Sequence, residues 1–124
     1  MNVVDSSGWL EYFGDGPNAQ FFAEAIEKTG ELVVPSLTLF EVFKRTLQLA
    51  DETTALNAVA VMMQGGVVDL SASLSIESAR LSSETGLAMA DAIILATARS
   101  ERAVLWTQDS HFDGLENVEF RRGQ

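Results

Sequence analysis

The sequence predicts an α/β fold around a central parallel sheet, and three observations support this fold class. Short apolar runs that are typical of buried strands alternate along the chain with longer stretches of helical periodicity. The 124 residues, 47% of them hydrophobic, suffice for one core without disulfides. No repeat, low-complexity tract or linker interrupts the sequence. We therefore expect a single domain over residues 1–124, in which alternating strands and helices form a parallel sheet covered on both faces.

The apolar runs predict five strands. We expect them at residues 2–5, 32–34, 67–70, 103–107 and 118–120. Six helices are expected between them: one through Trp9–Phe13, one from Asn18 onward, one that carries Leu39 to Leu47 on one side, and three over residues 51–63, 73–85 and 89–99. Residues 14–17 break the first helix, and Pro35 ends the second strand. Gly30 lies where we expect the C-cap of the second helix.

The chain is strongly acidic. Eight lysine and arginine residues stand against eighteen aspartate and glutamate residues, which gives a formal net charge of −10. Proteins that hold nucleic acid on their own surface are normally basic. The charge therefore indicates that the chain avoids nucleic acid, reaches phosphate through bound cations, has a basic partner, or is simply kept soluble by its acidity.

The composition also bears on the compartment. Cysteine is absent, which fits a reducing compartment and excludes zinc sites built on thiolates. The N-terminus shows no basic stretch followed by an apolar run, and no segment approaches the roughly 18 apolar residues of a membrane span. We expect a cytoplasmic protein that does not bind a membrane.

Four acidic residues are expected at one edge of the sheet. Asp5 follows the first strand, Asp109 comes two residues after the fourth, and Glu41 lies in the first turns of the helix after the second strand. Asp91 lies inside the apolar stretch 87–95, where an ionised carboxylate is costly unless a cation, a donor or a helix N-terminus meets it. Ligands of such folds bind beyond the carboxyl ends of the strands.

Each of these acids also has a purely structural interpretation. Asp5 and Asp109 can be N-caps of the helices that follow them. Glu41 can belong to a capping box that begins at Thr38, or can pair with Lys44 or Arg45. Asp91 can be an N-cap if its helix begins at Ala92. None of these interpretations explains why the four acids converge on one edge.

Clustered carboxylates must either hold protons or bind a hard cation. Mg²⁺ and Mn²⁺ suit oxygen ligands, and Mg²⁺ commonly bridges protein carboxylates to substrate phosphate. Such a cation can activate water for an in-line displacement at phosphorus. It also supplies the positive charge that the surface lacks.

With these residues placed, the sequence resembles the PIN-domain nucleases, specifically the VapC-type toxins of prokaryotic toxin–antitoxin pairs. The resemblance covers nearly the whole chain. It rests on four blocks in order: residues 3–7 (VVDSS), 35–42 (PSLTLFEV), 90–98 (ADAIILATA) and 105–112 (LWTQDSHF).

The resemblance implies a three-layer α/β/α fold with a five-stranded parallel sheet. It implies Mg²⁺- or Mn²⁺-dependent endonucleolytic cleavage of RNA that leaves a 5′-phosphate and a 3′-hydroxyl. Asp5, Glu41, Asp91 and Asp109 would be the metal-binding and catalytic acids. Ser6 and Thr107 would orient a carboxylate or a metal-bound water. Some family members have a further acid where this chain has His111, so the carboxylate that would serve a second metal site is absent at this position.

The resemblance also implies partners. Members of the family are commonly homodimers, and a cognate antitoxin neutralises each of them. An antitoxin tail typically lies in an apolar groove and extends a basic side chain toward the acidic pocket, which the charge of this chain suits. Candidate groove residues, or else ordinary core residues, are Phe40, Phe43, Leu47, Met62 and Met63.

The remaining residues with chemical potential have a structural interpretation that we favour. His111, the sole histidine, lacks a matched partner, so a structural or solvated role is favoured over that of a general base. Trp9 and Trp106 suit core packing better than base stacking. The candidate phosphate contacts are Lys44, Arg45, Arg80, Arg99 and Arg102, of which Lys44 and Arg45 lie nearest to Glu41.

Three other functions compete with the nuclease. A receiver-like signalling domain needs adjacent acids after the first strand and a lysine near the last, and the sequence has Val4-Asp5-Ser6 and no such lysine. A DNA flap nuclease needs insertions that a chain of this length lacks. The third alternative is a catalytically inactive PIN-like scaffold, and the presence of all four acids counts against it.

Overall fold

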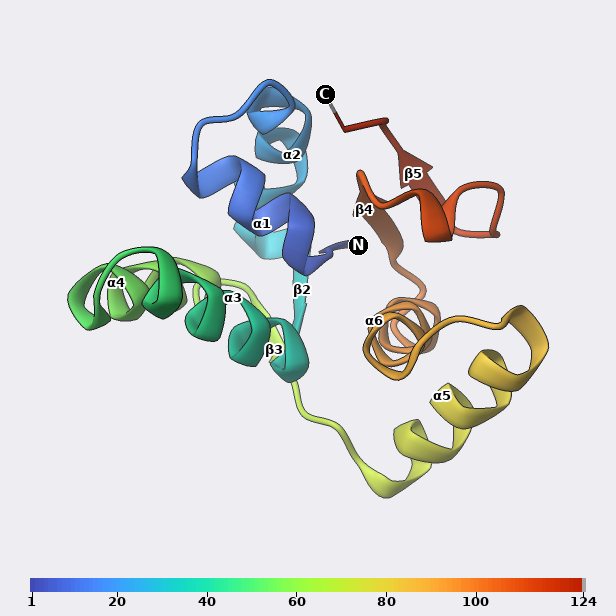
Figure 1. Ribbon diagram of the computed structural model, residues 1–124. Coiled ribbons are helices and arrows are strands. Elements are labelled where there is room, and N and C mark those ends of the chain that lie inside the picture. The colour runs from blue at the N-terminus through green and yellow to red at the C-terminus, as the bar shows by residue number, and fades with distance from the viewer. Residues whose placement is uncertain (124) are drawn as a thin grey trace.

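Five parallel strands form the central sheet of the computed structural model, which describes residues 1–123 (Figure 1). They are β1 (Asn2–Val4), β2 (Leu32–Pro35), β3 (Gly66–Val68), β4 (Val104–Thr107) and β5 (Val118–Phe120). Their order across the sheet is β3-β2-β1-β4-β5, and every neighbouring pair is parallel. The predicted α/β class with five parallel strands is therefore confirmed.

Six α-helices connect the strands. They are α1 (Ser6–Phe13), α2 (Ala19–Ile26), α3 (Ser36–Leu49), α4 (Glu52–Met62), α5 (Ala72–Thr85) and α6 (Met89–Ser100). Two short 3-10 turns, η1 (Thr29–Glu31) and η2 (Ser110–Phe112), complete the structure over the described residues. None of the helices in residues 1–123 has the length and apolar character that a membrane crossing would need.

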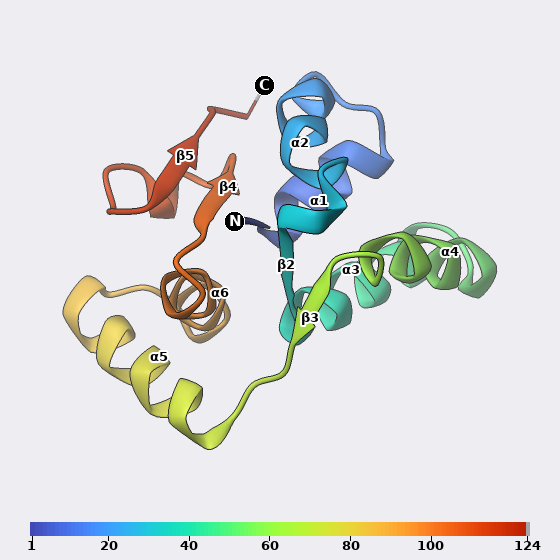
Figure 2. The ribbon, with the colours of Figure 1, turned by 180° about the vertical axis from the view of Figure 1, so that it is seen from behind.

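The helices cover the two faces of the sheet and give three layers. Helices α1 to α4 lie on one face, and α5 and α6 lie on the other (Figures 1 and 2). The alternation of side chains along the strands explains the division. Val3 points to the α5–α6 core, whereas Val4 points to the core under α1 to α4. Both are fully buried, and burial of such a side chain contributes about 1.5–3 kcal/mol.

The order of the strands creates a switch point at the centre of the sheet. The chain places β2 and β3 on one side of β1 and then returns to place β4 and β5 on the other side. The helices that connect parallel strands run antiparallel to them, so the N-termini of α1, α3 and α6 face the carboxyl edge of the sheet. Ligands of such folds bind at this edge, beside the switch point between β1 and β4.

Two local predictions were wrong. Gly30 is not a helix C-cap, because α2 ends at Ile26 and Gly30 lies in η1. The glycine that caps a helix in the left-handed conformation is Gly86, with φ of 78° at the end of α5. The third strand covers Gly66–Val68 rather than residues 67–70, because its partner β2 gives way to α3 directly after Pro35.

Gly8 sets how closely α1 approaches the rest of the fold. A Cβ atom at this position would lie 2.6 Å from Cε1 of Phe22 and 2.7 Å from Cγ1 of Val4. Both neighbours are fully buried and belong to one core cluster, so neither has room to move away. The absence of a side chain therefore fixes the first turn of α1 against the end of β1.

We predict that Gly8→Ala lowers the free energy of unfolding by about 1–3 kcal/mol, because the added methyl group overpacks the core. Urea denaturation measures the change. Gly30→Ala is the matched control, since a Cβ atom there has no neighbour within 4 Å, and its effect should stay below about 1 kcal/mol. Equal stability of the two variants would contradict the prediction.

Candidate active site

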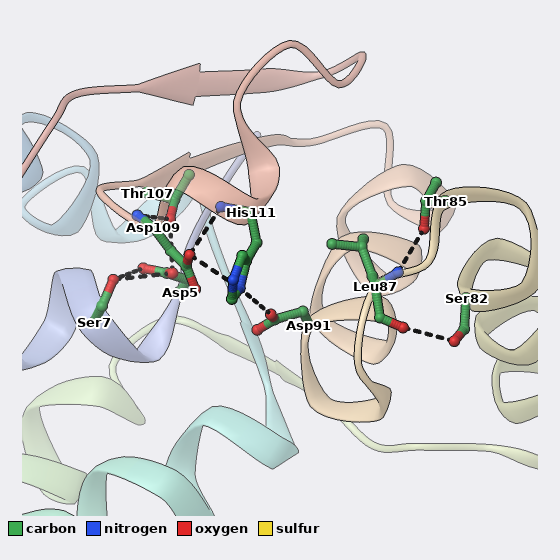
Figure 3. Close-up of polar contacts among 9 residues, drawn as sticks. All are labelled: Asp5, Ser7, Ser82, Thr85, Leu87, Asp91, Thr107, Asp109 and His111. Carbon is green, nitrogen blue, oxygen red and sulfur yellow. Dashed lines mark hydrogen bonds and ion pairs between the residues drawn. The ribbon is translucent and has the colours of Figure 1, made fainter.

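Four acidic side chains come from four different elements at the carboxyl edge of the sheet. Asp5 directly follows β1, Asp109 follows β4 by two residues, Glu41 lies on α3, and Asp91 lies in the first turn of α6. Their charges act on one another: Asp109 raises the pKa of both Asp5 and Asp91, and Glu41 raises that of Asp91. The structure thus brings the four predicted acids to one place, and Figure 3 shows three of them around His111.

Asp5 is the most buried of the four, with 4% of its surface exposed. Its Oδ1 accepts hydrogen bonds from the backbone N of Gly8 (2.9 Å) and the hydroxyl of Ser7 (2.9 Å). Its Oδ2 accepts from the hydroxyl of Thr107 (2.7 Å) and, at 3.0 Å, from Ser7 again. The Ser7 hydroxyl can rotate, so it is the donor that can leave Asp5 when a cation approaches.

Burial raises the pKa of Asp5 from 3.8 to about 6. The hydrogen bonds from Thr107, Gly8 and Ser7 lower the pKa, and the charge of Asp109 raises it further. The pKa is raised overall because removal of the carboxylate from water destabilises its charged form more than the three hydrogen bonds stabilise it. A cation at this position would relieve that cost.

Thr107 connects two of the acids. Its hydroxyl donates to Asp5 and accepts from the backbone N of Asp109 at 2.9 Å. Thr107 is fully buried at the end of β4, so its hydroxyl is held in place by the sheet. One side chain therefore sets the position of Asp5 and the start of the loop that carries Asp109.

Asp91 lies at the third position of α6, whose N-terminus favours a negative charge. Burial nevertheless raises the pKa of Asp91, and the charge of Asp109 raises it further. His111 opposes these effects, with Nδ1 at 3.6 Å from Oδ2 of Asp91 and 3.3 Å from Oδ1 of Asp109. Figure 3 shows the imidazole of His111 between the two carboxylates.

Among residues 1–123, the side chain of Glu41 has a single hydrogen-bond partner. Its Oε1 accepts from the hydroxyl of Ser6 at 2.6 Å, which ties the second turn of α3 to the first residue of α1. The second oxygen, Oε2, accepts no hydrogen bond from residues 1–123. The side chain is half-buried, so this oxygen remains available for a substrate or a cation.

The structure decides among the structural interpretations of the acids. Asp5 is the N-cap of α1 and Asp109 the N-cap of η2, so both cap a turn as well as belonging to the cluster. Asp91 is not an N-cap, because α6 begins at Met89. Glu41 belongs to no capping box, because α3 begins at Ser36 and the hydroxyl of Thr38 donates to Pro35 O instead.

Lysine and arginine do not neutralise the cluster. Across residues 1–123, the acids at this edge form an ion pair with His111 and with no lysine or arginine, including Lys44 and Arg45. Two other candidate phosphate contacts have partners elsewhere: Arg80 pairs with Glu77 at 2.7 Å, and Arg99 donates to Glu116 O.

One candidate phosphate contact escaped sequence reasoning. Arg121 directly follows β5, and its backbone N donates to Thr107 O at 3.0 Å, which places it at the same edge as the acids. Its guanidinium carbon Cζ lies 4.6 Å from the centroid of the Phe21 ring. The Phe21 ring in turn packs against Trp106, with 4.9 Å between the ring centroids. The three side chains line an open hollow of about 530 Å³. Phe21 is more than 80 residues from either partner, so no local pattern could reveal the group.

A second hollow, of about 560 Å³, is apolar and lies between α3 and α4. It is lined by Leu39, Phe40, Phe43, Lys44, Leu47, Leu56 and Val59. Three of the predicted groove residues are among them, and Phe40 is 62% exposed. Met62 takes the alternative core role instead, because α4 turns its side chain into the core, where it is fully buried. Trp9 is buried in the same cluster, as predicted.

The donors at the edge fit a divalent cation. One ligand atom each of Asp91, Asp109 and His111 lies within 4.8 Å of the others, and Asp5 and Glu41 add further carboxylates nearby. Carboxylate oxygens suit Mg²⁺ and Mn²⁺, and unpaired negative charge with raised pKa values is what such a cation relieves. The residues present therefore fit the metal that the sequence predicted.

Comparison with known proteins identifies similar chains. The family model described as PIN domain matches residues 3–117. A toxin–antitoxin complex from Klebsiella pneumoniae is 23% identical, with a TM-score of 0.81 and coverage of 96% of each chain. The Mycobacterium tuberculosis toxin VapC20, which cleaves the sarcin-ricin loop, is 14% identical, with a TM-score of 0.76 and coverage of 94% of this chain and 95% of that one.

DNA-bound VapBC from Salmonella typhimurium is also similar. It is 15% identical, with a TM-score of 0.75 and coverage of 98% of this chain and 97% of that one. At these identities the solved structures establish the fold. None of the curated proteins matches the sequence.

We predict a pH dependence of stability that originates at Asp5. The pKa of Asp5 is 3.8 in the unfolded chain and about 6 in the folded one, so the folded state holds this proton more tightly. The resulting contribution to the free energy of unfolding is complete below pH 4 and is lost as the pH rises through 6. Between pH 4 and pH 7, without divalent cations, the wild type should lose at most about 3 kcal/mol relative to Asp5→Asn. Urea denaturation in chelator measures both chains, and parallel pH curves would refute the assignment.

Proposed function

This chain belongs to the PIN-domain family, and we propose that it is a divalent-metal-dependent endoribonuclease, the toxin of a toxin–antitoxin pair. One observation carries the proposal. Four carboxylates converge at the switch point of the sheet, and no lysine or arginine among residues 1–123 pairs with them. A cluster of this composition favours a cation that can also bind the phosphate of a substrate.

Asp5, Glu41, Asp91 and Asp109 would hold Mg²⁺ or Mn²⁺. The bound cation supplies Lewis-acid activation of water and neutralises charge on the phosphodiester. Without it, the negative charge of the cluster repels the RNA backbone. The acidic surface of the chain is therefore compatible with its proposed action on RNA, because a cation held by the four acids would offset their negative charge.

The side chains around the cluster would divide the remaining tasks. Thr107 and Ser6 keep Asp5 and Glu41 in fixed positions through their hydroxyl groups. Glu41 is the better candidate to accept the proton of the attacking water. Its Oε2 accepts no hydrogen bond from residues 1–123, whereas both oxygens of Asp5 accept hydrogen bonds. Addition of water across the P–O3′ bond would leave a 5′-phosphate and a 3′-hydroxyl.

RNA would approach past Arg121 and Arg122. This pair follows β5 at the same edge, and Arg121 forms no ion pair with residues 1–123. The buried amide of Asn18 donates to Arg122 O and to Oε1 of Gln108 at 3.0 Å each, which anchors the arginines beside the loop of Asp109. A guanidinium held on an aromatic ring can contact phosphate or stack on a base.

The proposed toxin would have two protein partners, an antitoxin and a second copy of this chain, and would act in the cytoplasm. The apolar hollow between α3 and α4 would take an apolar antitoxin segment, and the charge of −10 favours a basic one. The similar structures are a toxin–antitoxin complex from Klebsiella pneumoniae and VapBC from Salmonella typhimurium, and they support an antitoxin as the partner. Homodimerisation and a cytoplasmic location are expected from the family.

We predict that Asp91→Asn lowers RNA cleavage at least about 100-fold, because loss of a direct ligand should exceed the effect of an outer-shell change. The assay uses purified chain with Mg²⁺, Mn²⁺ or chelator on a structured RNA pool that includes a sarcin-ricin loop. Asp15→Asn, which makes the same charge change in an exposed turn, should cleave like the wild type. Absence of cutting by the wild type with both metals would favour an inactive PIN-like scaffold.

We also predict that Arg121→Gln raises the KM for RNA and leaves kcat nearly unchanged, because the side chain binds the substrate without entering the chemistry. The slope of log affinity against log salt should become shallower by about 0.7, the value of one contact to single-stranded phosphate. Arg80→Gln on α5 is the charge-matched control. An unchanged salt slope for Arg121→Gln would exclude Arg121 from the RNA path.

A further inference from the structure

We propose that His111 is a ligand of the bound cation and that the imidazole shifts the metal preference of this site from Mg²⁺ toward transition metals such as Mn²⁺. This inference rests on the proposed function, because it concerns the same site. It goes further by assigning a ligand that is not an acid and by predicting a selectivity that a purely carboxylate cluster would lack.

The distances around His111 fit a shared coordination sphere. Nδ1 lies 3.3 Å from Oδ1 of Asp109 and 3.6 Å from Oδ2 of Asp91. Two ligands at about 2.1 Å from one cation lie about 3 Å apart at right angles and about 3.5 Å apart in tetrahedral geometry. The imidazole and the two carboxylates are therefore spaced like neighbouring ligands of one ion.

The backbone holds His111 in this position. The N of His111 donates to Oδ1 of Asp109 at 2.9 Å, so the carboxylate caps the turn η2 and fixes the start of the histidine side chain. The side chain itself is 73% exposed and has no partner in residues 1–123 other than Asp91 and Asp109. Nothing in the core depends on the imidazole, and a cation can reach it from solvent.

The chemistry of the donor decides the preference. Mg²⁺ is a hard ion that takes oxygen ligands and keeps several waters, whereas the affinity of nitrogen-containing sites for first-row transition metals rises from Mn²⁺ toward Cu²⁺. A nitrogen in place of an oxygen therefore costs Mg²⁺ more than Mn²⁺. The neutral imidazole also adds no negative charge, which lowers the attraction for a hard cation further.

A rival role for His111 is that of a counter-ion. A protonated imidazole between Asp91 and Asp109 would replace the cation rather than bind it. The two roles have opposite consequences for Mn²⁺ binding. Removal of a ligand weakens the binding of the metal, whereas removal of a competing positive charge strengthens it.

The test is metal binding without RNA, measured by calorimetry on the full chain. We expect His111→Ala to weaken Mn²⁺ binding at least about 10-fold, the lower end of losses at metal-site residues, and to change Mg²⁺ binding less than about 3-fold. His111→Asp should bind Mg²⁺ more tightly than the wild type. Ser110→Ala, an exposed neighbour in the same turn, is the control, and urea denaturation checks that each variant is folded.

A second readout uses the fact that His111 is the sole histidine. In chain labelled with ¹⁵N-histidine, the diamagnetic ion Zn²⁺ should shift the Nδ1 resonance, and Asp91→Asn should weaken that response. Unchanged or tighter Mn²⁺ binding by His111→Ala would overturn the inference and leave the nuclease proposal standing. Failure of the wild type to bind any of the three cations would overturn both.

Discussion

The fold depends on how it accommodates a buried carboxylate at the end of its central strand. Asp5 extends the pairing of β1 with β4, since its backbone N donates to Trp106 O at 3.2 Å. Burial of an unpaired carboxylate is costly, so donors must surround it. Thr107, Gly8 and Ser7 supply them, which requires the register of β4 against β1 and the close approach of α1 that Gly8 permits. The position of Asp109 follows from the same register through Thr107.

The site concentrates negative charge that no lysine or arginine among residues 1–123 neutralises. Asp91 and Asp5 keep raised pKa values although a helix N-terminus or several donors lie beside them. An arrangement that served stability alone would place a lysine or arginine among the acids. Carboxylates without a neutralising lysine or arginine lower the stability of the fold, and such a loss is expected where function requires a cation-binding pocket.

Two features of the site differ from a plain carboxylate cluster. His111 places an imidazole between Asp91 and Asp109, and Ser7 occupies the remaining acceptor positions of Asp5. Both side chains can move, since one is exposed and the other ends in a rotatable hydroxyl group. Asp5 is rigid by comparison, because the core and two further donors surround it. The site thus combines one rigid carboxylate, Asp5, with adjustable groups at its rim.

Hydrophobic periodicity is a local property, so the amino-acid sequence alone revealed the alternation of strands and helices. It likewise placed Asp5, Glu41 and Asp109 after the first, second and fourth strands. It also showed that Asp91 is anomalous within an apolar stretch. Packing between distant segments brings the Thr107 hydroxyl to Asp5 across 102 residues and places His111 between two acids. It also buries Met62 in the core while Phe40 stays exposed. These contacts depend on the strand order and register, which arise from packing between distant segments and leave no local pattern.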